Sequence, residues 1–271
     1  MKITFIGGGN MASAMIGGML KRGFKPTELR VVELLAQTQQ RLRHDFGVQV
    51  FDSPAEAVGD ADVIVLAIKP QNMREAALSL APLLTDQLVV TIAAGIRAAD
   101  LSRWLSGYGN IVRAMPNTPA LVQAGITGLY AMPSVAEAGR ATAQTLLQAV
   151  GDTLWFDNEA ALDAVTALSG SGPAYVFYIL EAMQEAGVAL GLTPQATRSL
   201  ALATFQGASL LAAQGGEEFS ELRTRVTSKG GTTERALQVM EAEGVKRALA
   251  QAILAAAERS RELGDQLSKA G

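Results

Sequence analysis

The sequence predicts an α/β fold in which a doubly wound parallel sheet is followed by a domain made only of helices. Over about the first 155 residues, short β-rich runs alternate with helical patterns, which is the order of a doubly wound sheet. Several runs are continuously apolar, as strands covered on both faces are. After Asp157 only helical patterns rich in Ala and Leu follow. We therefore expect two domains, residues 1–157 and 158–271.

The first domain is expected to hold eight strands separated by helices. The strand candidates are Ile3–Ile6, Arg30–Glu33, Val48–Phe51, Val63–Ala67, Leu88–Ile92, Asn110–Ala114, Thr127–Ala131 and Thr153–Phe156. The helical patterns between them include Ala36–Phe46, Met73–Leu80, Ala99–Leu105 and Val135–Val150.

The second domain is expected to be entirely helical. Its patterns are Glu159–Leu168, Pro173–Leu190, Pro194–Gln214, Phe219–Thr227, Thr232–Glu243 and Val245–Leu267. Thr193 is suited to cap a helix whose first residue is Pro194. The helices from 173 to 213 are apolar on more faces than a monomer needs, although a buried central helix would look the same. This pattern indicates a homo-oligomer, at least a dimer.

Composition excludes several classes of function. The net charge of −3 and pI near 5.4 provide no electrostatic footprint for nucleic acid. No apolar run reaches the roughly 18 residues that a membrane span requires. Residues 1–6 are interpreted as a strand and not as a signal peptide, so a cytoplasmic protein is expected.

Two residue types that often carry catalysis are nearly absent. The chain has no cysteine, and its one histidine, His44, lies in a charged stretch typical of an exposed helix face. Thiolate nucleophiles, Ser-His triads and a metal site are therefore not expected. Catalysis would have to come from a cofactor, carboxylates, hydroxyls or backbone groups.

A glycine-rich turn follows the first strand. After Ile6 comes G-x-G-x-x-A, formed by Gly7, Gly8, Gly9, Asn10, Met11 and Ala12, and then a helical pattern. In a dinucleotide-binding unit the first glycine permits the tight turn, the second leaves room for the pyrophosphate, and the small third residue lets the helix pack closely. The helix N-terminus attracts the phosphates. A purely structural turn is the alternative, but the flanking strand and helix favour a Rossmann-type cofactor site at residues 6–12.

Two more strand ends are candidates for the same site. Ala67, Ile68, Lys69 and Pro70 end the fourth strand, and Ala93, Ala94 and Gly95 end the fifth. Ligands of open α/β sheets lie beyond the carboxyl ends of the strands. Lys69 by itself is equally well explained as an ordinary exposed lysine. The stiff loop Met115–Pro119 is expected to be structural.

Two glycine-hydroxyl turns precede helices of the second domain. One is Ser169–Pro173, and the other is Ser228-Lys229-Gly230-Gly231-Thr232-Thr233. Helix capping by Thr232 or Thr233 would explain one hydroxyl, but not Ser, two Gly and two Thr together. Several N–H and hydroxyl donors at a helix N-terminus suit a small carboxylate. We therefore favour carboxylate binding at the second turn.

With these residues in hand, the chain resembles the pyrroline-5-carboxylate reductases over nearly its whole length. The motifs that carry the resemblance are Gly7–Ala12, Ala67–Pro70, Val112–Pro119, Val165–Tyr175 and Val226–Thr233. The resemblance implies hydride transfer from NAD(P)H to the C=N carbon of 1-pyrroline-5-carboxylate, which forms L-proline. It also implies an all-α C-terminal dimerisation domain that interlocks with its dimer mate, with the site between subunits.

On this reading, the second glycine-hydroxyl turn binds the substrate. Ser228, Gly230, Gly231, Thr232 and Thr233 are assigned to the substrate, and Thr233 is the catalytic candidate that hydrogen-bonds the ring nitrogen as proton donor or relay. A protonated cyclic imine needs no strong acid, which agrees with the lack of histidine and cysteine. Lys229 departs from the family's usual proline and is expected to point to water.

The second strand bears on the choice of nicotinamide cofactor. Glu33 lies 26 residues after Gly7 (33 − 7), close to the spacing of roughly 20 at which an acid binds the adenosine ribose. NADH is therefore expected over NADPH, because Leu34 offers no cation for a 2′-phosphate. Arg41 or Arg43 could supply one, and the alternative is that Glu33 points to solvent.

Two other functions are alternatives to this one. A 3-hydroxyacid dehydrogenase needs a general base, usually a lysine on the long interdomain helix, and residues 173–190 contain neither Lys nor His. A catalytically silent nucleotide-binding regulator has no reason to keep the Ser228–Thr233 loop.

Overall fold

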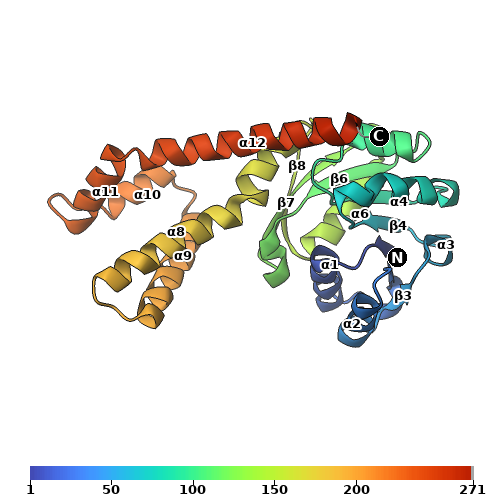
Figure 1. Ribbon diagram of the computed structural model, residues 1–271, viewed down its shortest axis with the longest axis horizontal. Helices are drawn as coiled ribbons and strands as arrows, with labels where there is room; N and C mark the ends of the chain where they lie inside the picture. Colours follow the sequence, from blue (N-terminus) through green and yellow to red (C-terminus); the bar gives the residue numbers. More distant parts are fainter. Residues whose placement is uncertain (270–271) are drawn as a thin grey trace. The chain divides into compact units, whose positions relative to one another are not determined.

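The computed structural model of the protein describes residues 1–269. Contacts divide the chain into two compact units. Unit 1 comprises Met1–Ser171 together with the segment from Ala256 on, and unit 2 comprises Gly172–Ala255. Figure 1 shows the strands, all in unit 1, and the helices of both units. The domain boundary expected after residue 157 remains a prediction. The change from mixed elements to helices follows the last strand, which ends at Trp155.

Unit 1 contains one eight-stranded sheet in the order β3-β2-β1-β4-β5-β6-β7-β8. The strands are β1 (Ile3–Ile6), β2 (Leu29–Val32), β3 (Gln49–Phe51), β4 (Val63–Leu66), β5 (Leu88–Thr91), β6 (Ile111–Met115), β7 (Gly125–Ala131) and β8 (Gly151–Trp155). All eight predicted strands are present, with ends displaced by two residues at most. The reversal of strand order at β1 and β4 is that of a dinucleotide-binding sheet.

The sheet is parallel except at one pairing. β7 runs antiparallel to β6, with Met115 opposite Gly128, so the expected doubly wound sheet is mostly parallel. The connection over residues 116–124 contains only the 3₁₀ turn η4 (Thr118–Val122). That is too short for a crossover helix, which a parallel pair needs. Asn117 closes the turn, because its Oδ1 accepts a hydrogen bond from the Ile126 N–H at 3.0 Å, as expected of a structural loop.

Helices cover both faces of the sheet, as the apolar strands predicted. They are α1 (Asn10–Lys21), α2 (Ala36–Phe46), α3 (Pro54–Ala57), α4 (Met73–Leu80), α5 (Ala98–Trp104), α6 (Glu137–Gln148) and α7 (Ala161–Val165). One buried cluster contains residues of α1, α2 and α6, and the other contains residues of α4 and α5. Met15 and Met19 in the first cluster and Met73 in the second are fully buried.

The segment predicted as one helix over Glu159–Leu168 is two elements. α7 is followed by a π-helical turn, η5 (Thr166–Gly170). The Ser171 N–H donates to the Thr166 carbonyl at 2.8 Å, which is a bond across five residues. The hydroxyls of Thr166 and Ser169 bond to carbonyls four residues back. Such side-chain bonds compete with the regular helix ladder and accompany its local widening.

Unit 2 is helical, as predicted. It contains α8 (Gly172–Ala189), α9 (Pro194–Gly215), α10 (Phe219–Arg225), α11 (Thr232–Ala242) and the first part of α12 (Val245–Lys269). The cap of α9 is confirmed, because Thr193 Oγ1 accepts from the Ala196 N–H at 3.2 Å and Pro194 follows it. None of the helices within residues 1–269 has the length and apolar character needed to cross a membrane.

Candidate active site

The glycine turn brings the ends of β1 and β4 together. Gly7 has φ +99°, and a β-carbon there would lie 2.6 Å from the Ala67 carbonyl oxygen. Only glycine satisfies both constraints. A β-carbon on Gly9 would meet no atom within 4 Å, so this position faces open space. Ala12 is fully buried against the core. Each position thus has the environment that its proposed part in dinucleotide binding requires.

The first turn of α1 is arranged to receive an anion. Gly9 is its N-cap, no side chain in the described chain caps it, and its first turn carries no acidic residue. The first N–H groups of a helix have no partners within the helix, and its N-terminus is partially positive. Asn10 is exposed and Met11 is half-buried beside it. These residues fit the pyrophosphate of a dinucleotide.

The acidic end of β2 faces the glycine turn. Glu33 Oε2 accepts a hydrogen bond from the Gly8 N–H at 3.0 Å, and Oε1 accepts from the Leu35 N–H at 2.9 Å. The Glu33 side chain therefore points to the glycine turn and not to solvent. Leu34 is 78% exposed beside it, so no cation follows the acid directly.

A cation reaches the turn from α2 instead. Arg41 Nη2 donates to the Gly8 carbonyl oxygen at 3.2 Å and to Ser13 Oγ at 3.3 Å. Arg43 points elsewhere, because its Nη2 donates to the Val50 carbonyl of β3 at 2.8 Å. Of the two arginines considered from the sequence, Arg41 is the one at the nucleotide turn.

The ends of β4 and β5 lie at the same edge of the sheet. The Ala67 N–H donates to the Ile6 carbonyl at 2.8 Å, and Ile68 is half-buried next to it. Lys69 is exposed, and Pro70 begins the turn η2 (Pro70–Asn72). Beyond β5, Ala93 is buried and Ala94 is exposed. Gly95 (φ +76°) lies against α12, a contact that the sequence did not predict. The candidate cofactor residues from β1, β2, β4 and β5 are thus brought together.

Sequence reasoning also missed an ion pair between the buried Arg113 and the half-buried Glu159. Arg113 of β6 is 4% exposed, and its Nη1 lies 2.9 Å from Glu159 Oε1. The same carboxylate oxygen accepts from the Ala98 N–H at 2.7 Å, at the start of α5. A charged residue inside an otherwise apolar strand is the signal that could have revealed this pair, because a buried charge requires a partner.

The candidate substrate loop lies in unit 2, between α10 and α11. Gly231 is the N-cap of α11, so Thr232 and Thr233 are its first two residues. The side-chain capping considered for these threonines is not found in the structure. The Gly230 N–H donates to Glu234 Oε2 at 2.7 Å, so a carboxylate of the chain itself lies at this helix N-terminus. Ser228, Lys229, Thr232 and Thr233 are exposed.

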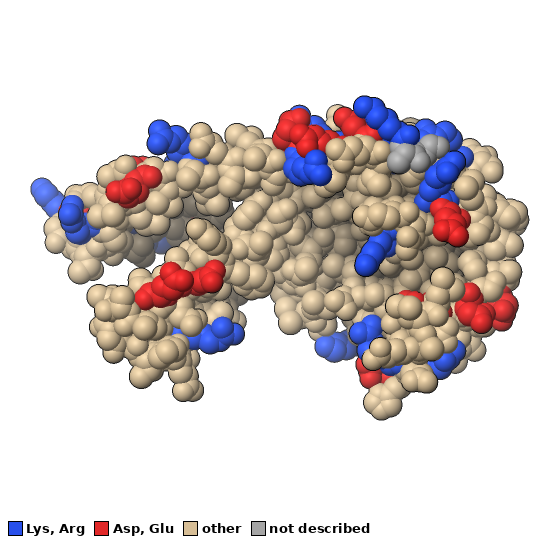
Figure 2. Space-filling view, in the orientation of Figure 1, with Lys and Arg blue, Asp and Glu red and all other residues tan. Residues whose placement is uncertain are grey.

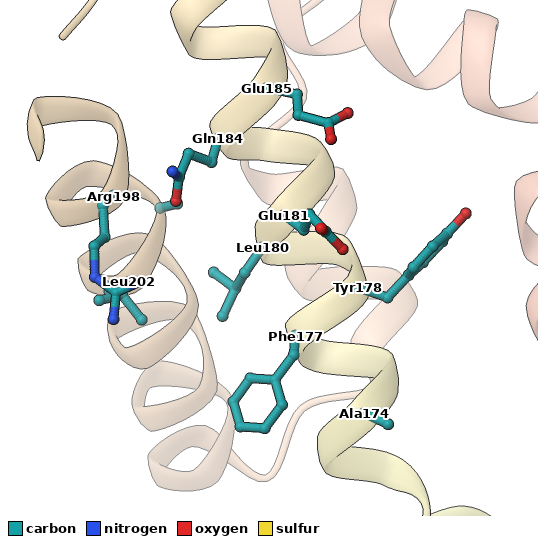
Figure 3. A pocket seen from close by; sticks show the side chains of 10 residues that line it. Ala174, Phe177, Tyr178, Leu180, Glu181, Gln184, Glu185, Arg198 and Leu202 are labelled. Atoms are coloured by element: carbon teal, nitrogen blue, oxygen red, sulfur yellow. The ribbon is translucent and has the colours of Figure 1, made fainter. Parts of the chain in front are cut away.

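α8 and α9 expose unusually large apolar side chains. Phe177 is 65% exposed, Tyr178 is 74% exposed and Leu202 of α9 is 45% exposed. A groove of about 750 Å³ lies between the two helices. In Figure 3 Phe177 and Leu180 lie on the side of α8 that faces α9, whereas Tyr178 points to the other side. Figure 2 shows few charged side chains on the face of these helices that it presents. Such surfaces are typical of helices that pack against another chain.

No group of His, Cys, Asp and Glu side chains within residues 1–269 could hold a metal ion. The doubly wound sheet with its glycine turn is the architecture of proteins that bind a dinucleotide. Residues 2–95 match the family model described as NADP oxidoreductase, coenzyme F420-dependent, and residues 159–263 match the model for pyrroline-5-carboxylate reductase dimerisation. A curated member of the pyrroline-5-carboxylate reductase family is 46% identical over 99% of this chain, so the chain belongs to that family.

Curated relatives and solved structures support this membership. The pyrroline-5-carboxylate reductase of Pseudomonas aeruginosa is 46% identical over 269 residues, covering 99% of this chain and 98% of that protein. A structure of a pyrroline-5-carboxylate reductase from Coxiella burnetii has a TM-score of 0.92 at 38% identity and covers 97% of this chain and 98% of its own. The NADP-bound reductase of Plasmodium falciparum has a TM-score of 0.86 at 27% identity, with the same coverage.

Proposed function

We propose that this protein reduces 1-pyrroline-5-carboxylate to L-proline by hydride transfer from NAD(P)H, the last step of proline biosynthesis. The observation that carries the proposal is the presence in one chain of the Gly7–Ala12 turn and the Ser228–Thr233 loop, each within a segment that matches its family model. A 3-hydroxyacid dehydrogenase or a silent regulator is not favoured. The relatives are reductases, and α8 carries no lysine or histidine to serve as general base.

The chemistry requires positioning more than acid–base strength. The reduced nicotinamide supplies the hydride, and a protonated cyclic imine is already electrophilic. The residues of this chain hold the substrate carboxylate, orient the C=N bond and exclude water. Correct positioning of two reactants can contribute about 7–11 kcal/mol, which suits a site without a strong acid–base pair. Thr233 hydrogen-bonds the ring nitrogen as donor or relay.

The local structure of the loop supports its part in carboxylate binding. Thr232 and Thr233 occupy the first turn of α11, where backbone N–H groups and hydroxyls lie at the positive end of the helix. Glu234 already accepts the Gly230 N–H, so that donor becomes available to the substrate only when the Glu234 side chain turns away. The Gly231 N–H likewise already donates to the Ser228 carbonyl, at 3.0 Å. Ser228 and Thr232 are therefore the first donors that the substrate meets.

For the cofactor, we propose that the enzyme prefers NADH over NADPH and that Arg41 reduces the size of this preference. The position of Glu33 beside Gly8 supports hydrogen bonds to the ribose hydroxyls, and its charge disfavours a 2′-phosphate. Arg41 lies on the same turn with opposite charge and attracts that phosphate. The enzyme should therefore accept NADPH at lower efficiency.

We propose a homodimer or a larger assembly of dimers, held by α8 and α9, in which the site lies between subunits. The exposed aromatic side chains of α8 support this assembly. We also propose a cytoplasmic location, because the reaction draws on the intracellular pool of reduced nicotinamide nucleotide.

The proposed reaction is tested by mixing the purified protein with NADH or NADPH and 1-pyrroline-5-carboxylate. Loss of nicotinamide absorbance that depends on the imine, with formation of proline, supports the proposal. Nucleotide binding without such loss would indicate a silent regulator. Oxidation of 3-hydroxyacids in the reverse assay, without imine reduction, would indicate the dehydrogenase.

A further inference from the structure

The C-terminal turns of α12 pack on the loop that follows β5. A β-carbon on Gly95 would lie 3.0 Å from Leu267 Cδ1 and 3.9 Å from the Gly264 backbone nitrogen. Leu267 packs against the buried cluster that includes residues of α4 and α5. The red end of α12 and the green segment after β5 lie side by side in Figure 1. The absence of a side chain on Gly95 therefore permits the close approach of α12 as well as the positive φ.

Polar contacts fasten the same turns to the start of α5. Ser268 Oγ donates to a carboxylate oxygen of Asp100, which is 7% exposed. Asp265 forms an ion pair with Arg97, the residue before α5. The side chains of Arg97 and Asp265 are 41% and 56% exposed, so solvent screens this pair and its contribution is small. Leu267 and Ser268 are thus the principal contacts.

The opposite end of this loop is fixed independently of α12. Glu159 accepts the Ala98 N–H at 2.7 Å and pairs with the buried Arg113 at 2.9 Å. The segment from Ala93 to Ala98 is therefore held between the half-buried Glu159 carboxylate and the end of α12. Ala93 and Ile96 are buried in the core as well, so what α12 adds is the contact at Gly95 and at the start of α5.

We propose that Leu267 and Ser268 are positioning residues for the nucleotide, because they hold the Ala93–Gly95 loop in its binding conformation. The inference rests on the proposed assignment of Ala93–Gly95 to the cofactor. If the loop is ordered only part of the time, the apparent affinity for nucleotide falls by the fraction of molecules that are competent to bind. Leu267 and Ser268 are distant in sequence from the glycine turn, and neither residue is assigned to contact the nucleotide.

Two serines of α12 provide a matched test. Ser268 donates to Asp100 at the loop, whereas Ser260 donates to Asp163 of α7 at 2.6 Å. Each Ser→Ala change removes one hydroxyl bonded to a carboxylate. The full-length Ser268→Ala, Ser260→Ala and Leu267→Ala variants are compared with wild type by hydrogen exchange of residues 93–100 and by nicotinamide fluorescence titration with NADH and NADPH. Ser268→Thr retains a hydroxyl and serves as the rescue.

Ser268→Ala is expected to raise the hydrogen-exchange rate of the loop and the Kd values for both nucleotides about fivefold. Leu267→Ala should raise them further. Ser260→Ala and Ser268→Thr should change them little. The KM for nucleotide should rise while kcat and the KM for the imine stay near wild type. Unchanged loop exchange and Kd in both Ser268→Ala and Leu267→Ala would overturn the inference and leave the proposed reaction standing. Equal effects of Ser260→Ala would overturn it too, because they would indicate general loosening of α12. A wild-type protein that binds neither nucleotide would overturn both this inference and the proposed function.

Discussion

The Glu33 carboxylate accepts a hydrogen bond from the Gly8 N–H at 3.0 Å, which fixes the acidic end of β2 against the glycine turn. Arg41 donates to the carbonyl of the same glycine at 3.2 Å. Opposite charges from two elements therefore act on one residue of the nucleotide turn. The balance between them is expected to determine how strongly the enzyme distinguishes NADH from NADPH.

Exchange of the β2 end should change cofactor preference. Glu33→Ser with Leu34→Arg removes the repulsive charge and adds an attractive one, so the ratio of kcat/KM for NADPH to that for NADH should rise. Partly exposed charges about 4 Å apart interact by roughly 1–4 kcal/mol, so a shift of about tenfold or more is expected. Arg41→Leu should move the ratio the opposite way. A wild-type enzyme that prefers NADPH by about tenfold or more would show that the argument from Glu33 is wrong.

Removal of the Thr233 hydroxyl should slow turnover without disturbing nucleotide binding. A positioned donor used mainly in the transition state is typically worth about 2.7–4 kcal/mol, so Thr233→Ala should lower kcat more than about a hundredfold. Thr224→Ala is the control, because Thr224 Oγ1 only donates to the Ser220 carbonyl within α10. Steady-state kinetics and nucleotide titration check both variants. Near-normal turnover of Thr233→Ala would contradict the proposed catalytic role of Thr233.

Assembly should depend on the apolar faces of α8 and α9. We expect an interface above about 2,000 Å², as obligate dimers have. Leu202→Glu in the α8–α9 groove should therefore weaken the assembly in analytical ultracentrifugation. Leu78→Glu is the matched control, since Leu78 of α4 is 52% exposed and Leu202 45%. An active wild-type monomer at micromolar concentration would contradict the proposed interface.

Acid should weaken the fold through Asp60. Hydrogen bonds from Arg30, and secondarily from Lys2, hold the pKa of the Asp60 carboxyl well below its usual 3.8. Because the folded-state pKa is depressed, this group stabilises the fold above pH 3.8, and the stabilisation is lost as the pH falls toward the folded-state value. Asp60→Asn should thus lower the free energy of unfolding at neutral pH, with a difference from wild type that shrinks below about pH 4.

Denaturant titrations at neutral and acidic pH, at low and high salt, measure this difference. Asp60 is exposed, so the effect should be small and should decrease with salt. Turnover at neutral pH should not change, because Lys2, Arg30 and Asp60 lie toward the amino ends of the strands, opposite the candidate site. A variant whose loss of stability is independent of pH would contradict the assignment to this carboxyl.

The elements were predictable because their signals are local. Strand runs, glycine turns and the Thr193-Pro194 cap depend on neighbouring residues, and the structure contains each of them. What the sequence did not reveal depends on contacts distant in the chain. The packing of Leu267 on Gly95 joins segments 172 residues apart (267 − 95). The pairing of Arg113 with Glu159 likewise joins β6 to the segment before α7.

The sequence predicted which residues form the candidate site but not the hydrogen bonds among them. Residues two apart on a helix do not share a face, so periodicity separates Arg41 from Arg43, but it could not show which of them reaches the turn. Nor could it show that Glu234 takes the Gly230 N–H in place of a threonine cap. The direction of β7 follows from the shortness of the 116–124 connection, whereas the predicted strand ends left a longer gap, residues 115–126.

The most direct test of the central claim is the stoichiometry of the reaction. Purified wild-type protein is given 1-pyrroline-5-carboxylate and reduced nucleotide, and nucleotide oxidised and L-proline formed are both measured, with Thr233→Ala in parallel. We predict one L-proline for each nucleotide oxidised, with higher efficiency for NADH and a rate in the variant more than about a hundredfold lower. Nucleotide binding by the wild-type protein without formation of L-proline would contradict the account.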